Sequence, residues 1–121
     1  GDAAFRLLDE VQAGAEAARG AEPGMAQAVW NAAEGLREAT EWLLEQGMEA
    51  RLAGSVPYQR AFARVLGGHF HLKAAIAGDA PRRVLARFYV RSLLPEHASL
   101  LAQMRDGAET VLALTPGDLA A

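Results

Sequence analysis

The chain has no cysteine, few aromatic residues and no uncharged apolar run of about 18 residues, and each absence excludes a class of protein. Without cysteine there is neither a disulfide scaffold nor thiol catalysis, which is consistent with a reducing cytoplasm. Without a long apolar run or a basic, apolar-cored leader, we expect no membrane span and no secretory signal. The chain begins at Gly1 and not at a methionine, so we expect a fragment of a larger, cytoplasmic protein.

What the chain does contain is alanine, leucine and helical periodicity. Its 121 residues are 51% hydrophobic and almost free of β-branched runs, which predicts a single all-α domain over residues 1–121. Apolar residues recur at alternating spacings of three and four in four segments. This pattern predicts an up-and-down antiparallel four-helix bundle. The residues expected to face the core are Phe5, Leu8, Val11, Ala15, Ala18, Met25, Val29, Ala32, Leu36, Ala39, Leu43, Tyr58, Phe62, Val65, His69, Leu72, Ile76, Ala86, Val90, Leu93, His97, Leu100 and Met104.

Helix caps and prolines set the expected bounds. The expected helices cover about 2–19, 25 to 47 or 54, 55–78, and 79 onward. Ser55 is the expected N-cap of the third helix, with Pro57 in its first turn, and Asp79 followed by Pro81 opens the fourth. Pro95 lies inside the fourth helix and removes a backbone donor, so we expect a kink or a break there.

The third helix also holds two adjacent glycines, Gly67 and Gly68. Such a pair costs a helix about 2 kcal/mol relative to alanine. We therefore expect another backbone to approach closely at this point. A neighbouring helix of the same chain is favoured over a partner protein.

Several short stretches are similar, in order, to a known helical domain. The residues that carry the similarity are Glu41, Trp42, Leu43, Leu44, Ala53, Gly54, Ser55, Val56, Pro57, Tyr58, Phe62, Val65, Gly67, Gly68, Ala74, Ala75, Arg87, Phe88, Tyr89, Leu93, Leu94, Pro95, Val111, Leu112, Ala113 and Leu114. Together they resemble the extra C-terminal helical domain of acyl-CoA dehydrogenases, in the branch similar to 3-methylmercaptopropionyl-CoA dehydrogenase. The likeness covers nearly the whole chain.

The resemblance implies a part of an FAD-dependent enzyme that oxidises an acyl-CoA thioester to its α,β-enoyl form. In that family a glutamate of the preceding helical domain abstracts the α-proton and the flavin accepts the hydride. The motif that holds this glutamate is absent here, so no catalytic, cofactor-binding or metal-binding residue is assigned to this chain. FAD and acyl-CoA are expected only in the full-length protein.

Charge is distributed unevenly. Residues 51–91 hold eight of the twelve basic residues and a single acid, which gives this window a charge of +7, while the rest of the chain carries −10. The basic residues form two groups, Arg60 with Arg64, and Arg83 with Arg87 and Arg91. An acidic row lies on the second helix, namely Glu34, Glu38, Glu41, Glu45 and Glu49.

Three interpretations of the arginines remain open. The favoured one is ion pairing across the bundle with the acidic row, and this row is expected to be solvated or paired and not catalytic. The second is docking on other domains of the enzyme or on its dimer mate. The third is contact with phosphates of CoA, FAD or nucleic acid. Nucleic acid is the least favoured, because the chain is acidic overall, with a pI near 5.6.

The histidines and aromatics offer weaker signals. Helix register places His69 and His97 about 10 Å apart along the bundle axis, so we expect each to be a buried, hydrogen-bonded side chain and not a shared metal ligand. His71 is expected to be exposed. A di-iron site would need Glu-x-x-His motifs, which the sequence lacks. Trp30 and Phe70 lie off their helix seams and, if exposed, indicate a surface covered by a partner.

We therefore expect a non-catalytic accessory domain that supports the catalytic domains or the dimer of a homo-oligomeric acyl-CoA dehydrogenase. The alternative is a free-standing helical module for protein interaction or oligomerisation. A third, less favoured interpretation is a bundle that binds a small ligand near His69 and Phe62.

Overall fold

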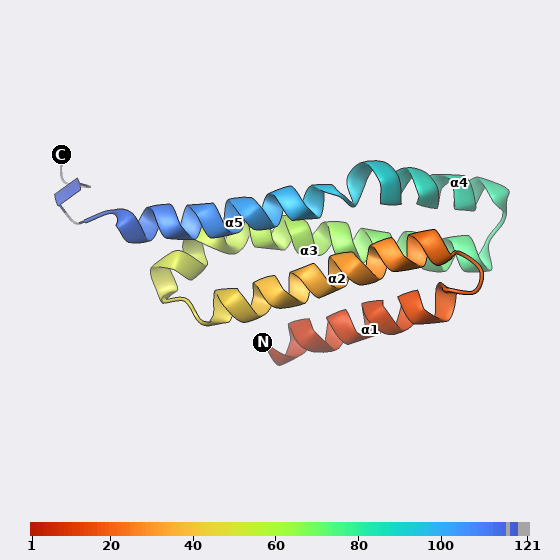
Figure 1. The fold of residues 1–121 in the computed structure, drawn as a ribbon, viewed down its shortest axis with the longest axis horizontal. Helices are drawn as coiled ribbons and strands as arrows, with labels where there is room; N and C mark the ends of the chain where they lie inside the picture. Colours follow the sequence, from red (N-terminus) through yellow and green to blue (C-terminus); the bar gives the residue numbers. More distant parts are fainter. Residues whose placement is uncertain (116, 119–121) are drawn as a thin grey trace.

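The computed structural model describes residues 1–115 and 117–118, and within them every regular element is helical. The elements are α1 (Asp2–Ala18), α2 (Pro23–Leu44), α3 (Met48–Ala77), α4 (Ala80–Phe88), the π-helical segment η1 (Tyr89–Leu93) and α5 (Glu96–Ala113). The first three helices alternate in direction, and α4, η1 and α5 together return along α3 (Figure 1). The predicted antiparallel four-helix bundle is therefore confirmed, with the last helix in three pieces.

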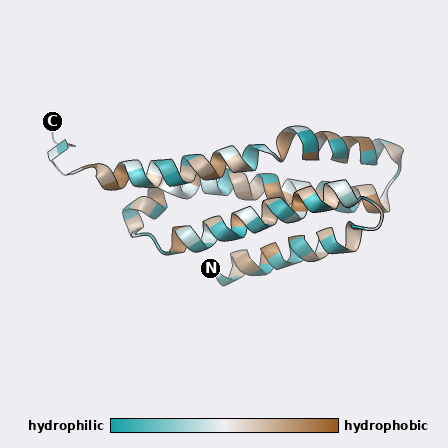
Figure 2. Cartoon of the chain, in the orientation of Figure 1, coloured by the Kyte–Doolittle hydropathy of each residue, from teal (hydrophilic) through white to brown (hydrophobic). Residues whose placement is uncertain are grey.

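The core is built largely from small side chains, which lets the helices approach closely. The largest fully buried residues are Leu8, Val11, Val29, Leu36, Val65, Leu72 and Met104, and alanines fill much of the remaining space. The predicted seams are mostly buried. Six of the predicted seam residues are only half-buried, and Ile76 is exposed, at 45%. Hydrophobic residues are not confined to the core, because Figure 2 shows them along α4 as well.

The third helix starts earlier than its sequence predicts. It begins at Met48 with Gly47 as N-cap, so Ser55 and Pro57 lie inside it. Ser55 is not a cap, because its Oγ donates a hydrogen bond back to the carbonyl of Leu52, 2.9 Å away. Pro57 lacks an N–H for the carbonyl four residues earlier, and the first turns of α3 bend away from the rest of the helix (Figure 1). Gly54 serves packing here, since a Cβ on it would lie 2.9 Å from Cγ of Met104.

The fourth helix opens and breaks where its sequence predicts. Asp79 caps α4 by accepting a hydrogen bond from the backbone N of Arg82 at 3.2 Å. The helix then widens in η1, where the N–H of Leu94 reaches the carbonyl of Tyr89 at 2.9 Å, five residues back. Pro95 follows directly and starts α5. The predicted break near Pro95 is confirmed, and its structural form is a wide turn.

Candidate functional site

The Gly67–Gly68 pair makes room for an aromatic side chain. A Cβ on Gly67 would overlap the hydroxyl of Tyr89 and lie 3.1 Å from its Cε2. The Tyr89 hydroxyl donates a hydrogen bond to the backbone carbonyl of Arg64 at 2.7 Å, and burial of the ring raises the pKa of Tyr89. Gly68 faces the side chains of Leu94 and Val29. The neighbour of Gly67 is thus a tyrosine ring of the same chain and not another backbone.

His71 completes this aromatic contact. Its ring stacks on Tyr89 with 4.5 Å between ring centroids and 24° between planes. The expectation that His71 would be exposed is wrong, because the ring of Tyr89 covers one of its faces and leaves it half-buried. Gly67, His71 and Tyr89 together join α3 to the start of η1. We call this set of contacts the interlock, and its role is structural.

The arginines do not pair with the acidic row of α2. Within residues 1–115 and 117–118, Arg64 is the one member of the two predicted groups in an ion pair, and its partner is Glu96 of α5, at 2.9 Å. Glu34 instead lies 3.7 Å from Arg37 of its own helix. The favoured interpretation is therefore wrong for the described residues. For Arg83, Arg87 and Arg91 the physical reason is position, because the acidic row runs along α2 to Glu49 in the first turn of α3, at the end of the bundle away from α4 (Figure 1).

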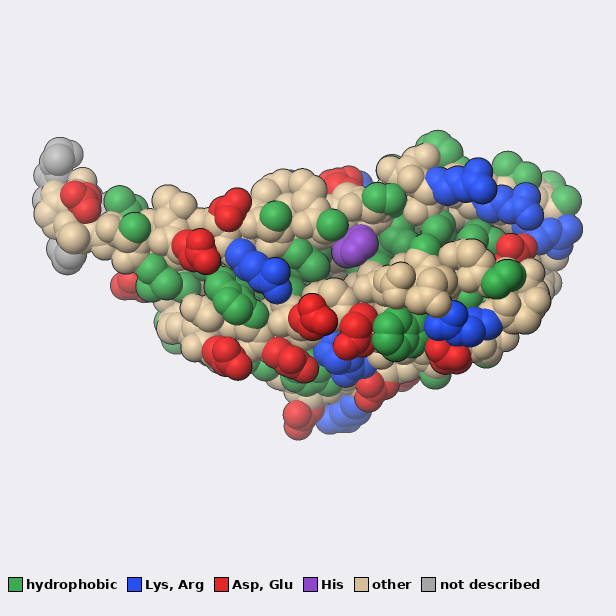
Figure 3. All heavy atoms as spheres, viewed as in Figure 1, with side chains coloured by type: hydrophobic (Ala, Val, Ile, Leu, Met, Phe, Trp, Pro, Cys, Tyr) green, Lys and Arg blue, Asp and Glu red, His purple; other side chains and the backbone are tan. Residues whose placement is uncertain are grey.

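Arg82 and Arg87 of α4 and Arg91 of η1 are exposed, whereas Arg83 is half-buried and donates a hydrogen bond to the carbonyl of Gly78 at 3.3 Å. Arg87 and Arg91 lie beside the start of α2 and border a hollow of about 360 Å³ with Glu22, Gly24 and Met25. Figure 3 shows basic side chains gathered over the α4 end of the bundle, away from the acidic ones on α1 and α2. The predicted roles in docking or phosphate contact both require such exposure. Arg60 and Arg64 border a second hollow next to Glu96.

The outer side of α3 carries an apolar strip, which we call the α3 outer face and define as Leu52, Val56, Ala63 and Phe70. At 100° per residue, these four positions fall within about 40° of one another. Phe70 is 60% exposed, as expected for a residue off the seam, whereas Trp30 packs partly against the core. On α4, Val84, Leu85 and Phe88 are exposed as well. A helix that is apolar on both sides is typical of one covered on both sides.

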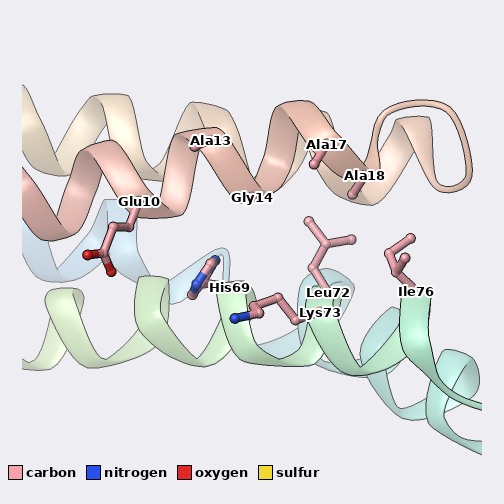
Figure 4. Close-up of a pocket in the computed structure, with 9 residues that line it drawn as sticks. All are labelled: Glu10, Ala13, Gly14, Ala17, Ala18, His69, Leu72, Lys73 and Ile76. Carbon is pink, nitrogen blue, oxygen red and sulfur yellow. The ribbon is translucent and has the colours of Figure 1, made fainter.

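Between α1 and α3 lies a groove of about 470 Å³, lined by Glu10, Ala13, Gly14, Ala17, Ala18, His69, Leu72, Lys73 and Ile76 (Figure 4). His69 is 7% exposed, and its Nδ1 is buried with no hydrogen-bond partner among the described residues. The expectation of a hydrogen-bonded histidine is thus wrong for this atom. It is confirmed for His97, whose Nδ1 lies 2.7 Å from the carbonyl oxygen of Leu94. Phe62 does not line the groove.

The environment of His69 keeps its ring neutral. Burial lowers the pKa of His69, the nearby ammonium of Lys73 lowers it further, and the carboxylate of Glu10 acts in the opposite direction. Among the described residues, no group of three or more His, Asp or Glu side chains is placed to hold a metal ion.

A comparison with protein families identifies the domain. Residues 7–115 match the family model described as acetyl-CoA dehydrogenase C-terminal like. The chain belongs to this family. No curated protein and no solved structure matches the chain.

In this acetyl-CoA dehydrogenase C-terminal-like domain, three residues of the sequence resemblance make structural contacts. Trp42 lies under the guanidinium of Arg105, with 5.9 Å from Cζ to the ring centroid. The hydroxyl of Tyr58 donates to Oγ1 of Thr40 at 2.6 Å, because the Thr40 hydroxyl already donates to the carbonyl of Leu36. Tyr89 joins α3 to η1.

Sequence reasoning missed three residues that line the groove of this domain, namely Glu10, Gly14 and Lys73. They come from two helices that are distant in the chain. Their only sequence signal was a glycine in the middle of α1, Gly14, which invites the question of what approaches it. Among the described residues, no helix combines the length and apolar character needed to cross a bilayer.

Proposed function

We propose that this chain is the C-terminal accessory domain of an FAD-dependent acyl-CoA dehydrogenase and contributes no catalytic residue. The observation that carries the proposal is the family match over residues 7–115, taken together with the uncovered α3 outer face. A bundle that is stable through its own core, yet apolar on one outer side, fits a domain that rests against a larger protein.

The proposed docking surface is the α3 outer face together with Val84, Leu85 and Phe88 of α4. Burial of a large apolar side chain contributes about 1.5–3 kcal/mol, so covering Phe70 and Phe88 alone is a substantial gain. The exposed arginines of α4 flank this area and supply charged contacts at its rim. The partners are the remaining domains of the same enzyme or its dimer mate, in a cytoplasmic homo-oligomer.

The described residues of this chain do not fit a flavin site. Arg87 and Arg91 are exposed, and Nδ1 of His69, which has no hydrogen-bond partner among those residues, faces the backbone of Gly14. The chemistry of thioester oxidation therefore belongs to the preceding domains under this proposal. The present domain acts by position, holding those domains or the dimer in place.

The first test is the reading frame around the chain. We expect an upstream flavin-binding β-domain and a helical domain with a catalytic glutamate. A start codon directly before Asp2 would contradict the accessory role and favour the alternative, a free-standing interaction or oligomerisation module. That alternative is favoured by the same exposed apolar side chains.

The second test uses the full-length enzyme with Phe70→Glu. We expect an unchanged flavin content, a lower melting temperature and faster proteolytic release of this domain, because a buried contact with the catalytic domains is lost. Gln103→Glu, on the exposed side of α5, is the matched control and should leave all three unchanged. Identical melting and cleavage for both variants would contradict docking through the α3 outer face. Turnover of 3-methylmercaptopropionyl-CoA, compared with that of a thioester of similar chain length without the thioether sulfur, tests the proposed enzyme branch.

A further inference from the structure

The groove between α1 and α3 is apolar along its length and polar at one end. Ala13, Ala17 and Ala18 form one wall, and Leu72 and Ile76 form the other (Figure 4). Glu10, His69 and Lys73 lie together at the end of the groove away from Ala18 and Ile76 (Figure 4). The α1 wall from residue 10 to residue 18 is about 12 Å long at 1.5 Å per residue. These dimensions suit a small chain-like molecule and are too small for a helix of another protein.

The surroundings of His69 favour one tautomer of its imidazole. A Cβ on Gly14 would lie 3.1 Å from Nδ1, so this nitrogen faces the backbone of α1 without a partner among the described residues. A buried acceptor without a partner is tolerated better than a buried N–H without one. The neutral ring therefore carries its proton on Nε2, which makes Nε2–H a hydrogen-bond donor at the polar end of the groove.

Glu10 and Lys73 add an acceptor and a second donor. Within the described part of the chain neither residue forms an ion pair, although both act on His69. The polar end thus offers one carboxylate acceptor and two donors, with no net charge. An anionic head group would be repelled by the carboxylate of Glu10, and a cationic one would be repelled by the ammonium of Lys73. A neutral group with one acceptor and one donor matches this set.

We propose that this groove binds a neutral, unbranched apolar chain that carries a secondary amide at one end. The amide carbonyl accepts hydrogen bonds from Nε2 of His69 and Nζ of Lys73, and the amide N–H donates to the carboxylate of Glu10. The alkyl chain lies along Ala13, Ala17, Leu72 and Ile76. This site is separate from the α3 outer face and does not depend on the accessory role.

The test is titration of the purified chain with N-hexylacetamide, followed by NMR and calorimetry. We expect saturable shifts confined to residues of the groove, including the His69 ring. Hexyl acetate has nearly the same shape but no N–H, and we expect it to bind about tenfold more weakly because the bond to Glu10 is lost. Hexanoate and hexylammonium test the neutral head group and should bind more weakly than the amide.

Ala17→Leu fills the groove and should abolish the saturable shifts. Ala3→Leu is the matched control, an exposed alanine of the same helix outside the groove, and should bind as the native chain does. Glu10→Gln keeps the packing and should reduce the preference for amide over ester, whereas Glu41→Gln should not. This second pair keeps the proposal testable if Ala17→Leu fails to fold.

Three results would overturn the proposal. They are the absence of saturable shifts with N-hexylacetamide, equal binding by Ala17→Leu and the native chain, and equal affinity for the amide and the ester. A failure of Phe70→Glu to loosen the domain would leave the groove proposal standing, because Phe70 lies outside the groove.

Discussion

The two sides of α3 are packed in opposite ways. Toward α4, η1 and α5, glycines receive large side chains, Tyr89 at Gly67 and Met104 at Gly54, and α3 and α5 make the most extensive contact in the bundle. On the other side, the residues of α1 that face α3 along the groove are mostly alanine and glycine, and they leave the groove open. Gly14 also receives a ring there, that of His69, but this ring borders open space. The comparison indicates that one side of α3 holds the fold together while the other can admit a ligand.

The largest expected effect on stability comes from adding a methyl group where α3 packs closely against Tyr89. Gly67→Ala places a methyl group into the Tyr89 ring, which is held by its hydrogen bond to Arg64 and by the His71 stack. We expect a loss of about 1–3 kcal/mol in the free energy of unfolding, in spite of the gain in helix propensity. Urea denaturation measures it.

A matched control for Gly67→Ala is Gly35→Ala in α2. Apart from its chain neighbours and the backbone of its own helix, a methyl group on Gly35 would have no atom of the described residues within 4 Å, so this variant reports helix propensity alone. We expect a gain of about 0.5–1 kcal/mol in the free energy of unfolding. If both variants were stabilising, Tyr89 would have to move freely and the interlock would not exist.

The groove side should show itself in the pH dependence of stability. The pKa of His69 is lower in the folded chain than in the unfolded one, chiefly through burial and then through Lys73, with Glu10 opposing. The unfolded chain therefore takes up the proton first as pH falls. Stability is fully present above pH ~6.5 and declines below it, by at most about 1.4 kcal/mol per pH unit for one group. Urea midpoints at pH 7.5 and 5.5 measure the decline.

His69→Gln should make the decline of stability with falling pH shallower. This holds even if the substitution also changes the free energy of unfolding by the same amount at every pH. His97→Gln is the matched control, because it removes an imidazole that contacts the carbonyl of Leu94 in a different part of the bundle. An unchanged pH slope in His69→Gln would mean that the imidazole is solvated in the folded chain.

The sequence predicts the helices better than it predicts the contacts between them. Asp79 as a cap and Pro95 as a break depend on local chemistry, so position in the chain was enough. Ser55 misled because serine, then proline two residues later, is typical of a helix start, whereas the contact of Gly54 with Met104 of α5 joins residues distant in the chain. The groove joins Glu10 and Gly14 to Lys73 across more than fifty residues, and local periodicity holds no information on such pairs.

A smaller effect is expected from the Arg64–Glu96 pair between α3 and α5. Its atoms lie 2.9 Å apart, but both side chains are partly exposed, so water and salt screen the attraction. We expect Glu96→Gln to lower the free energy of unfolding by less than about 1 kcal/mol, and a high salt concentration should remove the difference. A loss of unfolding free energy as large as that of Gly67→Ala would mean that this ion pair is a principal contact between α3 and α5.

The smallest effect is expected from Gly14→Ala, and it tests the comparison most directly. As at Gly67, a Cβ here is too close to a ring, 2.8 Å from Cε1 of His69. His69 can move toward the open groove, however, which Tyr89 cannot do on the other side. We expect the cost to offset the propensity gain, leaving the free energy of unfolding within about 0.5 kcal/mol of the native value. The displaced imidazole should weaken N-hexylacetamide binding in the same variant. A destabilisation equal to that of Gly67→Ala would show that α1 is held as rigidly as α5, and a groove that cannot yield to one methyl group would be a poor ligand site.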